Sequence, residues 1–382
     1  MFSFNDGRLN STVEAVIGGT YRVPLTRAGS TTQYTAPLRD IQRLRQLSSA
    51  ERRTLSFAFD VDGHLVNESP SLMTGTPEKS LWRDTPYVHA RSTHGGDRPA
   101  RLIYVIPGNP GLCEFYADFV AALSELVPNA AIAAVSYLGY NVDTPDDQAP
   151  LFMLDEQVQH KVDFLHFFHT TVGRDLPVYV LGHSVGAWIA QRIAHRRSEV
   201  VFVGLMAPTI KDIALSERGR NVTSLTRYVG TNTVWAAVWA LKWVPFYQIV
   251  VMQLLRRIMP ISEITGIARE ATLGIALSPT VCRQIVGLAI EEMQRIGPDI
   301  EPIDIRGFWA NKNRRIWALF AEHDHWVSPE SRAAIVELSR GLPHMLTEQL
   351  PVPHSFVLRD SETVAALAAR QILETGPPGP RS

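Results

Sequence analysis

Cysteine is scarce in this chain of 382 residues, which holds only Cys113 and Cys282. Two cysteines are too few for a disulfide framework or a cysteine zinc site, so a reducing compartment fits the composition better than secretion, and neither a metal nor another cofactor is indicated. Neither sign of charge is in excess, because 37 lysine and arginine residues stand against 38 aspartate and glutamate residues. We therefore expect no polyanion-binding surface and no nucleic-acid partner.

The N-terminal segment lacks the pattern of a signal peptide. MFSFNDGRLNSTVEAVIGG has no basic start followed by an apolar run of about 7 to 15 residues, so we expect no signal peptide. At the other end, residues 374–382 read ETGPPGPRS, and this glycine- and proline-rich composition predicts a disordered tail.

Apolar residues are present in ordinary amount, 45% of the chain, and their pattern changes near residue 100. Residues 1–95 carry alternating segments such as TLSFAFDVDGHLV, which are typical of antiparallel strands in an N-terminal extension. Beyond residue 100, short apolar runs alternate with helical patterns; the runs are RLIYVIPG, AAIAAVSYLG, PVYVLGHS, VVFVGLMAP, RRIWALFAEHD and HMLTEQLPV. This alternation predicts an α/β fold whose mostly parallel sheet has helices on both faces.

A long insertion separates two parts of the predicted core. The run VVFVGLMAP is followed by about 105 residues before RRIWALFAEHD, far more than one crossover helix requires. We therefore divide the α/β core into residues 96–210 and 313–373, and assign residues 211–312 to a helical cap or lid.

The cap contains an apolar segment at residues 229–260. Within residues 234–255 the single charge is Lys242, and Pro245 divides the apolar run into two pieces. Three tryptophans at four-residue spacing share one helical face: Trp235, Trp239 and Trp243. Tryptophan beside cations is typical of a membrane interface, whereas an apolar helix can equally be a lid packed on the core. The two interpretations are compatible and both stay open.

A serine stands between two glycines in VLGHSVGAWIA, residues 180–190. Gly182, Ser184 and Gly186 form a G-x-S-x-G motif between an apolar strand pattern and a helical pattern. A serine on a sharp strand-to-helix turn needs neighbours with almost no side chain, which glycine supplies. We therefore interpret Ser184 as a nucleophile held in a tight turn, and His183 as a residue that orients or packs nearby.

A nucleophilic serine needs a base that takes its proton, and the base is a histidine farther along the chain. His354 lies in the loop PVPHSFVL after the last predicted strand, with a helix after it, and is our choice. The other downstream histidines are less suitable, because His344 begins the strand itself and His323 and His325 leave no room for a preceding acid.

The base in turn needs a carboxylate that fixes its tautomer. IWALFAEHDHW ends a predicted buried strand and places Asp324 at the carboxyl edge of the sheet, where sites of such folds gather. We choose Asp324 as the acid, with Glu322 and Asp212 as alternatives.

The oxyanion formed by attack needs preorganised N–H donors. One donor is expected from Val185, the residue after the nucleophile, and the other from the loop IPGNPG at residues 106–111. Proline has no N–H, so the loop offers Gly108, Asn109 and Gly111. We favour Asn109, and the alternative of a simple proline-glycine turn stays open.

Five segments together resemble the lipid droplet-associated hydrolases, a family of α/β-hydrolases, over about residues 100–360. The I-P-G-N-P-G block followed by F-Y is the most distinctive part. The segments are YVIPGNPGLCEFYADFV, LGHSVGAWIA, LMAPTIKDIALSERGR, LSPTVCRQIVGLAIEEM and AEHDHWVSP.

This resemblance implies an α/β-hydrolase fold in which Ser184, Asp324 and His354 form the triad. It further implies a serine hydrolase of lipid esters, sterol esters in particular, at the lipid droplet and the cytosolic face of the endoplasmic reticulum. A soluble esterase or thioesterase for small acyl groups, a cofactor-free haloperoxidase and a droplet-bound scaffold with a vestigial site are the alternatives. Epoxide hydrolases and dehalogenases of this fold need a carboxylate at position 184.

Overall fold

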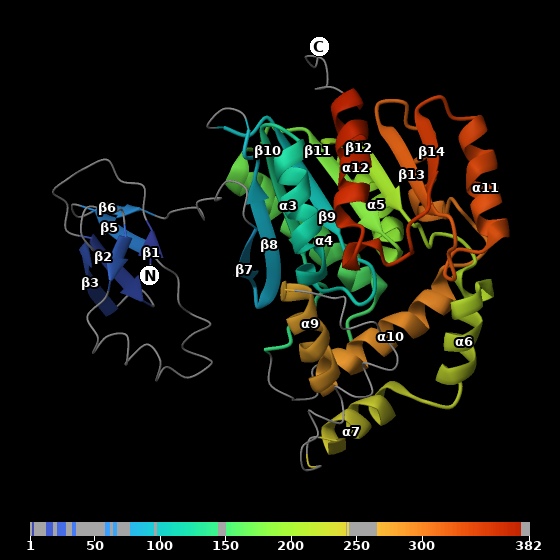
Figure 1. The fold of residues 1–382 in the computed structure, drawn as a ribbon, viewed down its shortest axis with the longest axis horizontal. Coiled ribbons are helices and arrows are strands. Elements are labelled where there is room, and N and C mark those ends of the chain that lie inside the picture. The colour runs from blue at the N-terminus through green and yellow to red at the C-terminus, as the bar shows by residue number, and fades with distance from the viewer. Residues whose placement is uncertain are drawn as a thin grey trace. The chain divides into compact units, whose positions relative to one another are not determined.

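The computed structural model describes most of the chain from residue 77 to residue 375. The described ranges are 77–94, 98–143, 150–241, 243 and 266–375, together with the backbone of six short strands between residues 2 and 66. Most of the predicted apolar segment 229–260, from residue 244 on, and residues 376–382 of the predicted tail lie outside these ranges. The chain divides into two compact units, Met1–Ser71 and Leu72–Ser382 (Figure 1).

The first unit contains a six-stranded sheet with antiparallel pairing and the order β1-β4-β3-β2-β5-β6. Its strands are β1 (Phe2–Ser3), β2 (Val13–Ile17), β3 (Tyr21–Arg27), β4 (Gln33–Thr35), β5 (Ala58–Val61) and β6 (His64–Val66).

The second unit is built on an eight-stranded sheet with the order β14-β13-β12-β11-β9-β10-β8-β7. Six neighbouring strands are parallel: β9 (Arg101–Ile106), β10 (Ala130–Val135), β11 (Val178–His183), β12 (Val200–Met206), β13 (Arg315–Ala321) and β14 (Met345–Leu350). β8 (Thr85–Arg91) and β7 (Glu78–Trp82) continue the sheet in antiparallel pairing. The mostly parallel sheet predicted from the apolar runs is confirmed, and β7 and β8 join it from within residues 1–95.

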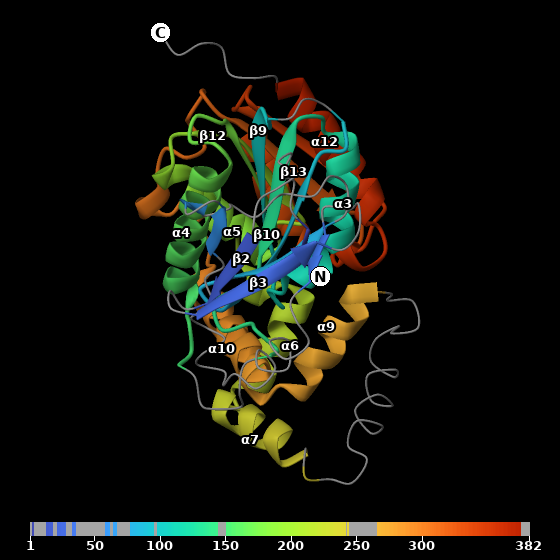
Figure 2. The same cartoon turned by 90° about the vertical axis from the view of Figure 1, so that its left-hand side faces the viewer.

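Helices cover both faces of this sheet, as Figure 2 shows. α3 (Ala117–Leu126) and α12 (Ser361–Thr375) pack together on one face, and α4 (Leu154–Val172) and α5 (Val185–Arg196) lie on the other. α11 (Pro329–Arg340) lies beside β14. The central strands, such as β10 with every residue buried, are apolar throughout because both of their faces are covered.

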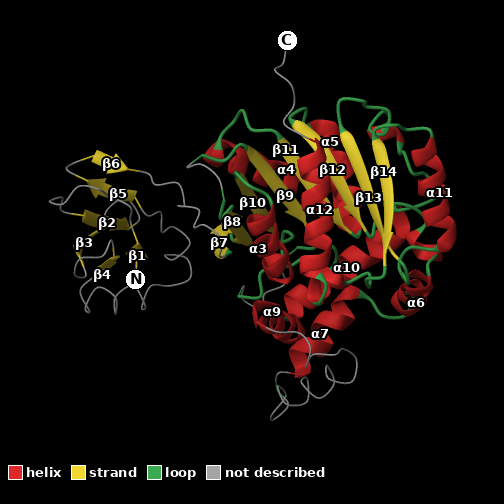
Figure 3. Cartoon of the chain, turned by 45° about the horizontal axis from the view of Figure 1, so that its top comes forward, coloured by secondary structure: helices red, strands yellow, loops and turns green. Residues whose placement is uncertain are grey.

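Four described helices lie between β12 and β13 in the chain: α6 (Glu217–Thr226), α7 (Thr231–Leu241), α9 (Gly266–Leu277) and α10 (Pro279–Arg295). They gather beyond one end of the sheet (Figure 3). α10 begins at a Ser-Pro pair, in which the Ser278 hydroxyl accepts a hydrogen bond from the Val281 N–H at 3.3 Å and Pro279 occupies the first helical turn.

Within the described residues, no single helix is long and apolar enough to cross a membrane. One helix pair, Ala268–Leu277 with Pro279–Arg295, meets the length and composition requirements together, but it bends by 93° at its break.

Candidate active site

Ser184 lies at the junction of β11 and α5 with a backbone φ of 55° and ψ of −124°. Its flanking glycines are required by close backbone approach. A β-carbon at Gly182 would lie 2.3 Å from the Gly186 carbonyl oxygen, and one at Gly186 would lie 2.4 Å from the carbonyl oxygens of Ile106 and Pro107. These distances are far shorter than carbon–oxygen contact, so side chains at either position would force the strand-to-helix turn and the loop after β9 apart.

The structure brings the three predicted triad residues into one hydrogen-bonded chain. His354 Nε2 lies 3.0 Å from Ser184 Oγ, and His354 Nδ1 lies 2.9 and 2.8 Å from the two carboxylate oxygens of Asp324. The carboxylate accepts only, so Nδ1 carries the proton and Nε2 is free to accept the serine proton. The residues are separated by 170 and 30 positions in sequence and meet because β11, β13 and β14 end at the same edge of the sheet.

Asp324 is held as an anion by the donors around it. Its Oδ1 accepts hydrogen bonds from the Trp326 N–H at 2.8 Å and the Val327 N–H at 3.1 Å. Burial by itself would raise the pKa of Asp324, but the hydrogen bond and charge of His354 and these two backbone donors lower it below the ordinary value. The carboxylate is therefore charged at neutral pH and can stabilise an imidazolium at His354.

Neither alternative acid is hydrogen-bonded to His354, whose Nδ1 is bonded to Asp324. Glu322 has an exposed side chain, and Asp212 is paired with Lys211 at 2.8 Å. The other downstream histidines are also engaged or exposed: His325 pairs with Glu217 at 2.7 Å, His344 Nε2 bonds the Trp309 carbonyl oxygen at 2.6 Å, and His323 is exposed.

The loop after β9 lies against Ser184. A β-carbon at Gly108 would be 2.9 Å from Ser184 Cβ, so this loop passes directly beside the serine. The Gly108 N–H already donates to the Tyr116 hydroxyl at 2.7 Å. Among the described residues, the N–H groups of Asn109 and Val185 have no hydrogen-bond partner. Both are the donors predicted for the oxyanion hole, and because the Gly108 N–H is already bonded, Asn109 is the more available of the two.

The Asn109 side chain is fully engaged and does not compete for that role. Its Nδ2 donates to the Ile285 carbonyl oxygen at 3.1 Å and to Glu292 Oε1 at 3.0 Å, and its Oδ1 accepts from the Tyr140 hydroxyl at 3.1 Å. Ile285 and Glu292 belong to α10, so the loop is attached to the helices that lie between β12 and β13. Sequence reasoning missed Glu292, which stands in a run of helix-forming residues without any motif.

His183, inside the serine motif, connects the loop to the base. Its Nε2 lies 2.8 Å from the His354 carbonyl oxygen, and its Nδ1 lies 2.7 Å from the Tyr116 hydroxyl. Burial, with the charge of His354, lowers the pKa of His183 to about 3, so its ring is neutral. A carbonyl only accepts, so Nε2 carries the proton and Nδ1 accepts from Tyr116. His183, predicted to orient or pack nearby, is thus hydrogen-bonded to Tyr116 and to the backbone of His354.

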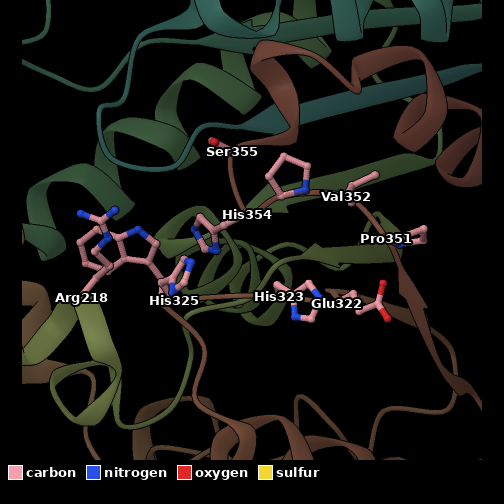
Figure 4. Close-up of a pocket in the computed structure, with 10 residues that line it drawn as sticks. Arg218, Glu322, His323, His325, Pro351, Val352, His354 and Ser355 are labelled. Carbon is pink, nitrogen blue, oxygen red and sulfur yellow. The ribbon is translucent and has the colours of Figure 1, made fainter. Parts of the chain in front are cut away.

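A pocket of about 600 Å³ opens beside His354 (Figure 4). In the figure, Arg218 and His325 lie on one side of His354, and His323 and Glu322 on the other. Apolar atoms of its wall come from a tryptophan and the loop after β14; the residues are Trp326, Pro351, Val352 and Pro353. Within the ranges that the structure describes, no group of three His, Cys, Asp or Glu side chains could hold a metal ion.

An aromatic face is exposed on α7 and the turn that follows it. Trp235 and Trp239 stack with ring centroids 6.0 Å apart, and Trp239 and Trp243 meet edge to face at 5.7 Å. Trp239 is 41% exposed and Trp243 is 75% exposed, and no described residue of α7 is buried. The predicted shared face of these tryptophans is present, whereas Lys242 lies outside the described residues.

Comparison with known proteins identifies relatives over the second unit. A family model described as "Lipid-droplet associated hydrolase" matches residues 99–357. A lipid droplet-associated hydrolase from Rattus norvegicus is 34% identical over 179 residues, which cover 42% of this chain and 54% of the relative. One from Drosophila melanogaster is 24% identical over 294 residues, covering 71% and 88%. The chain thus spans about half the length of the first relative and most of the second.

Solved structures share the fold. The haloalkane dehalogenase DbeA from Bradyrhizobium elkani aligns with a TM-score of 0.52 and 14% identity, covering 78% of this chain and 98% of that protein. An identity this low shows the fold alone. The α/β-hydrolase fold expected from the sequence is confirmed.

Proposed function

Because the chain belongs to the lipid droplet-associated hydrolase family, we propose that it is a serine hydrolase that cleaves carboxylic esters of lipids at the droplet surface. The observation that carries the proposal is the hydrogen-bonded chain from Ser184 through His354 to Asp324, with contacts of 3.0, 2.9 and 2.8 Å. A strained serine, a histidine nitrogen within hydrogen-bond distance of its hydroxyl and a buried carboxylate behind that histidine together are what acyl transfer requires.

In the proposed reaction, Ser184 Oγ attacks the ester carbonyl carbon while His354 Nε2 takes the serine proton. The negative charge that develops on the carbonyl oxygen is stabilised by the N–H groups of Val185 and Asn109. Asp324 remains ionised and stabilises the imidazolium. His354 then protonates the leaving alcohol, and an acyl group stays on Ser184.

The second half of the reaction uses the same groups with water as the nucleophile. His354 Nε2 removes a proton from water, whose oxygen attacks the acyl carbon and forms a second oxyanion at Val185 and Asn109. Collapse releases the carboxylic acid, and the proton returns from His354 to Ser184 Oγ. The cycle consumes one ester and one water, releases an alcohol and a carboxylic acid, and returns Ser184 and His354 to their starting states.

The exposed aromatic face supports action at a lipid surface. Trp239 on α7 and Trp243 in the turn after it present large amphipathic rings to solvent, and such rings favour the boundary between water and lipid. The helix lies in the same insertion as α10, which contacts the loop carrying Asn109. Substrates that reach the site from a droplet are apolar esters, and we propose sterol esters among them.

A series of esters with rising acyl length, sterol esters included, tests the function when it is measured with the wild type and Ser184→Ala. We expect hydrolysis of long-chain and sterol esters that depends on Ser184. Activity confined to short acyl groups would instead identify a small-ester esterase or thioesterase. A folded wild type with no activity above Ser184→Ala would identify a scaffold with a vestigial site.

A further inference from the structure

Three tyrosine hydroxyls hold three consecutive residues of the loop beside Ser184. The Tyr137 hydroxyl donates to the Pro107 carbonyl oxygen at 2.6 Å, and the Tyr116 hydroxyl accepts from the Gly108 N–H at 2.7 Å. The Tyr140 hydroxyl donates to Asn109 Oδ1 at 3.1 Å. Every residue from the end of β9 to Asn109 is therefore held by a tyrosine.

The three tyrosines come from two chain segments next to the loop and are closed off from water. Tyr116 follows the loop itself, whereas Tyr137 and Tyr140 lie in the connection after β10, the strand paired with β9. Their exposed fractions are 2%, 0% and 0%. Burial raises the pKa of all three hydroxyls, so they stay neutral and keep their protons.

We propose that Tyr116, Tyr137 and Tyr140 are positioning residues that set the oxyanion-hole loop in its catalytic geometry. The proposal rests on the proposed function, because it assigns the Asn109 N–H as an oxyanion donor. The three hydroxyls engage the Pro107 carbonyl oxygen, the Gly108 N–H and the Asn109 side chain, and they leave the Asn109 N–H without a hydrogen-bond partner. A donor fixed before substrate arrives costs no reorganisation during the reaction.

Tyr116 has a second contact that extends this arrangement to the base. Having accepted from Gly108, its hydroxyl donates to His183 Nδ1 at 2.7 Å, and His183 Nε2 donates to the His354 carbonyl oxygen at 2.8 Å. The path joins the oxyanion loop, the residue before the nucleophile and the backbone of the base. Only the neutral tautomer of His183 with the proton on Nε2 satisfies all of these partners.

The hydroxyl groups, rather than the rings, are what this role requires. The rings of Tyr137 and Tyr140 pack edge to face at 5.5 Å, and phenylalanine would preserve that packing. Phenylalanine at position 116, 137 or 140 would remove one loop contact and leave its loop partner unpaired. The loop would then sample other positions, and a shift of about 1 Å in a catalytic donor can lower the rate by about a hundredfold.

The test is to measure the hydrolysis of a 4-nitrophenyl ester by the variants Tyr116→Phe, Tyr137→Phe and Tyr140→Phe in the full-length chain. Tyr104→Phe is the matched control, since Tyr104 is a fully buried tyrosine whose hydroxyl donates to the Lys161 carbonyl oxygen at 3.3 Å and to no group of the loop. We expect kcat to fall about tenfold or more in each loop variant, KM to change less than twofold, and Tyr104→Phe to match the wild type.

A second measurement distinguishes a displaced oxyanion-hole loop from a general loss of protein stability. The Ser184 adduct of a phosphonate inhibitor places a phosphoryl oxygen where the oxyanion forms, so its phosphorus-31 resonance should shift in the loop variants and stay in Tyr104→Phe. Folded loop variants with wild-type kcat and an unshifted resonance would overturn the proposal, as would an equal loss in Tyr104→Phe. A wild type that neither hydrolyses the ester nor reacts with the phosphonate would instead refute the proposed function.

Discussion

Ser184, the proposed nucleophile, shows at the scale of one residue how backbone strain and close packing fix the position of a serine hydroxyl. A non-glycine residue with a φ of 55° is uncommon, and such strain persists only where the surroundings enforce it. Here the surroundings are the backbones of Ile106 and Pro107, which approach Gly186 so closely that no side chain fits. The neighbouring backbone therefore fixes the strained conformation of Ser184 in the strand-to-helix turn.

This packing gives an expectation for Gly186→Ala. The new methyl group would meet two carbonyl oxygens at 2.4 Å, so we expect a loss of about 1–3 kcal/mol in the free energy of unfolding and at least a tenfold loss of kcat. Gly297→Ala is the control, because a β-carbon there has no atom within 4 Å. Urea unfolding and ester hydrolysis measure both effects. Equal behaviour of the two variants would contradict the account.

The sequence predicts the serine, base and acid because each has a local signal. The glycines around Ser184 mark a tight turn, and Asp324 and His354 each follow an apolar strand pattern. His183, Tyr116 and Glu292 carry no such signal. The contacts Tyr116–His183 and Asn109–Glu292 span 67 and 183 positions of sequence, and only the folded chain defines them.

At the scale of elements, α10 is tied to the active-site loop through a buried carboxyl group. Glu292 is 4% exposed and accepts from Asn109 Nδ2. Burial raises the pKa of Glu292 to about 8, although the hydrogen bond from Asn109 lowers it in part and the charge of Glu291 raises it further. The group is thus protonated at neutral pH, and a neutral carboxyl group joins the helix to the loop.

This raised pKa makes stability depend on pH. Between the ordinary value of 4.5 and about 8, the folded protein holds a proton that the unfolded chain has lost, so stability falls as pH rises through this window. The slope from this one group is about 1.4 kcal/mol per pH unit. We expect Glu292→Gln to remove that slope and to keep kcat, because the glutamine oxygen still accepts from Asn109.

Urea unfolding between pH 5 and 8 measures the slope. Glu270→Gln, at an exposed position of α9, is the control and should follow the wild type. A Glu292→Gln variant with the wild-type dependence on pH would show that this carboxyl group does not retain its proton.

The exposed tryptophans of α7 and the turn after it give a separate prediction at the same scale. We expect the double variant Trp239→Ser, Trp243→Ser to bind neutral-lipid droplets covered by a phospholipid monolayer at least tenfold more weakly than the wild type. This is a change of about 1.4 kcal/mol in binding free energy, and it is expected because the variant loses apolar area that would enter lipid. Hydrolysis of a water-soluble ester should stay at the wild-type rate. Leu81→Ser, which changes a residue 65% exposed on β7, is the control. Unchanged droplet binding by the tryptophan variant would show that this aromatic face does not contact the lipid surface.

The chain as a whole divides into two compact units, and the triad residues belong to only one of them. Ser184, Asp324 and His354 all lie in Leu72–Ser382, and the described strands of Met1–Ser71 pair only with one another. We therefore expect residues 72–382, produced alone, to fold and to hydrolyse a water-soluble ester at a rate within about threefold of the full chain. Circular dichroism and the same ester assay provide the measurement, and a folded but inactive product would assign the first unit a part in the chemistry.

The sequence predicts the architecture of the second unit well, because apolar runs of buried parallel strands and helical patterns alternate along it. It predicts the attachment of the insertion less well. The sequence of α10 is that of an ordinary amphipathic helix. Nothing in it indicates that Glu292 accepts a hydrogen bond from Asn109. Buried polar partners of this kind depend on which surfaces meet, and local propensity does not encode that.

The central claim is that Ser184 is the nucleophile of a working triad. Reaction of the intact full-length protein with a fluorophosphonate, followed by mass-spectrometric mapping of the adduct, tests it most directly. We expect a single covalent adduct on Ser184 in the wild type, none in Ser184→Ala, and labelling slowed at least a hundredfold in His354→Ala. A folded wild type that stays unlabelled, or equal labelling of Ser184→Ala, would contradict it.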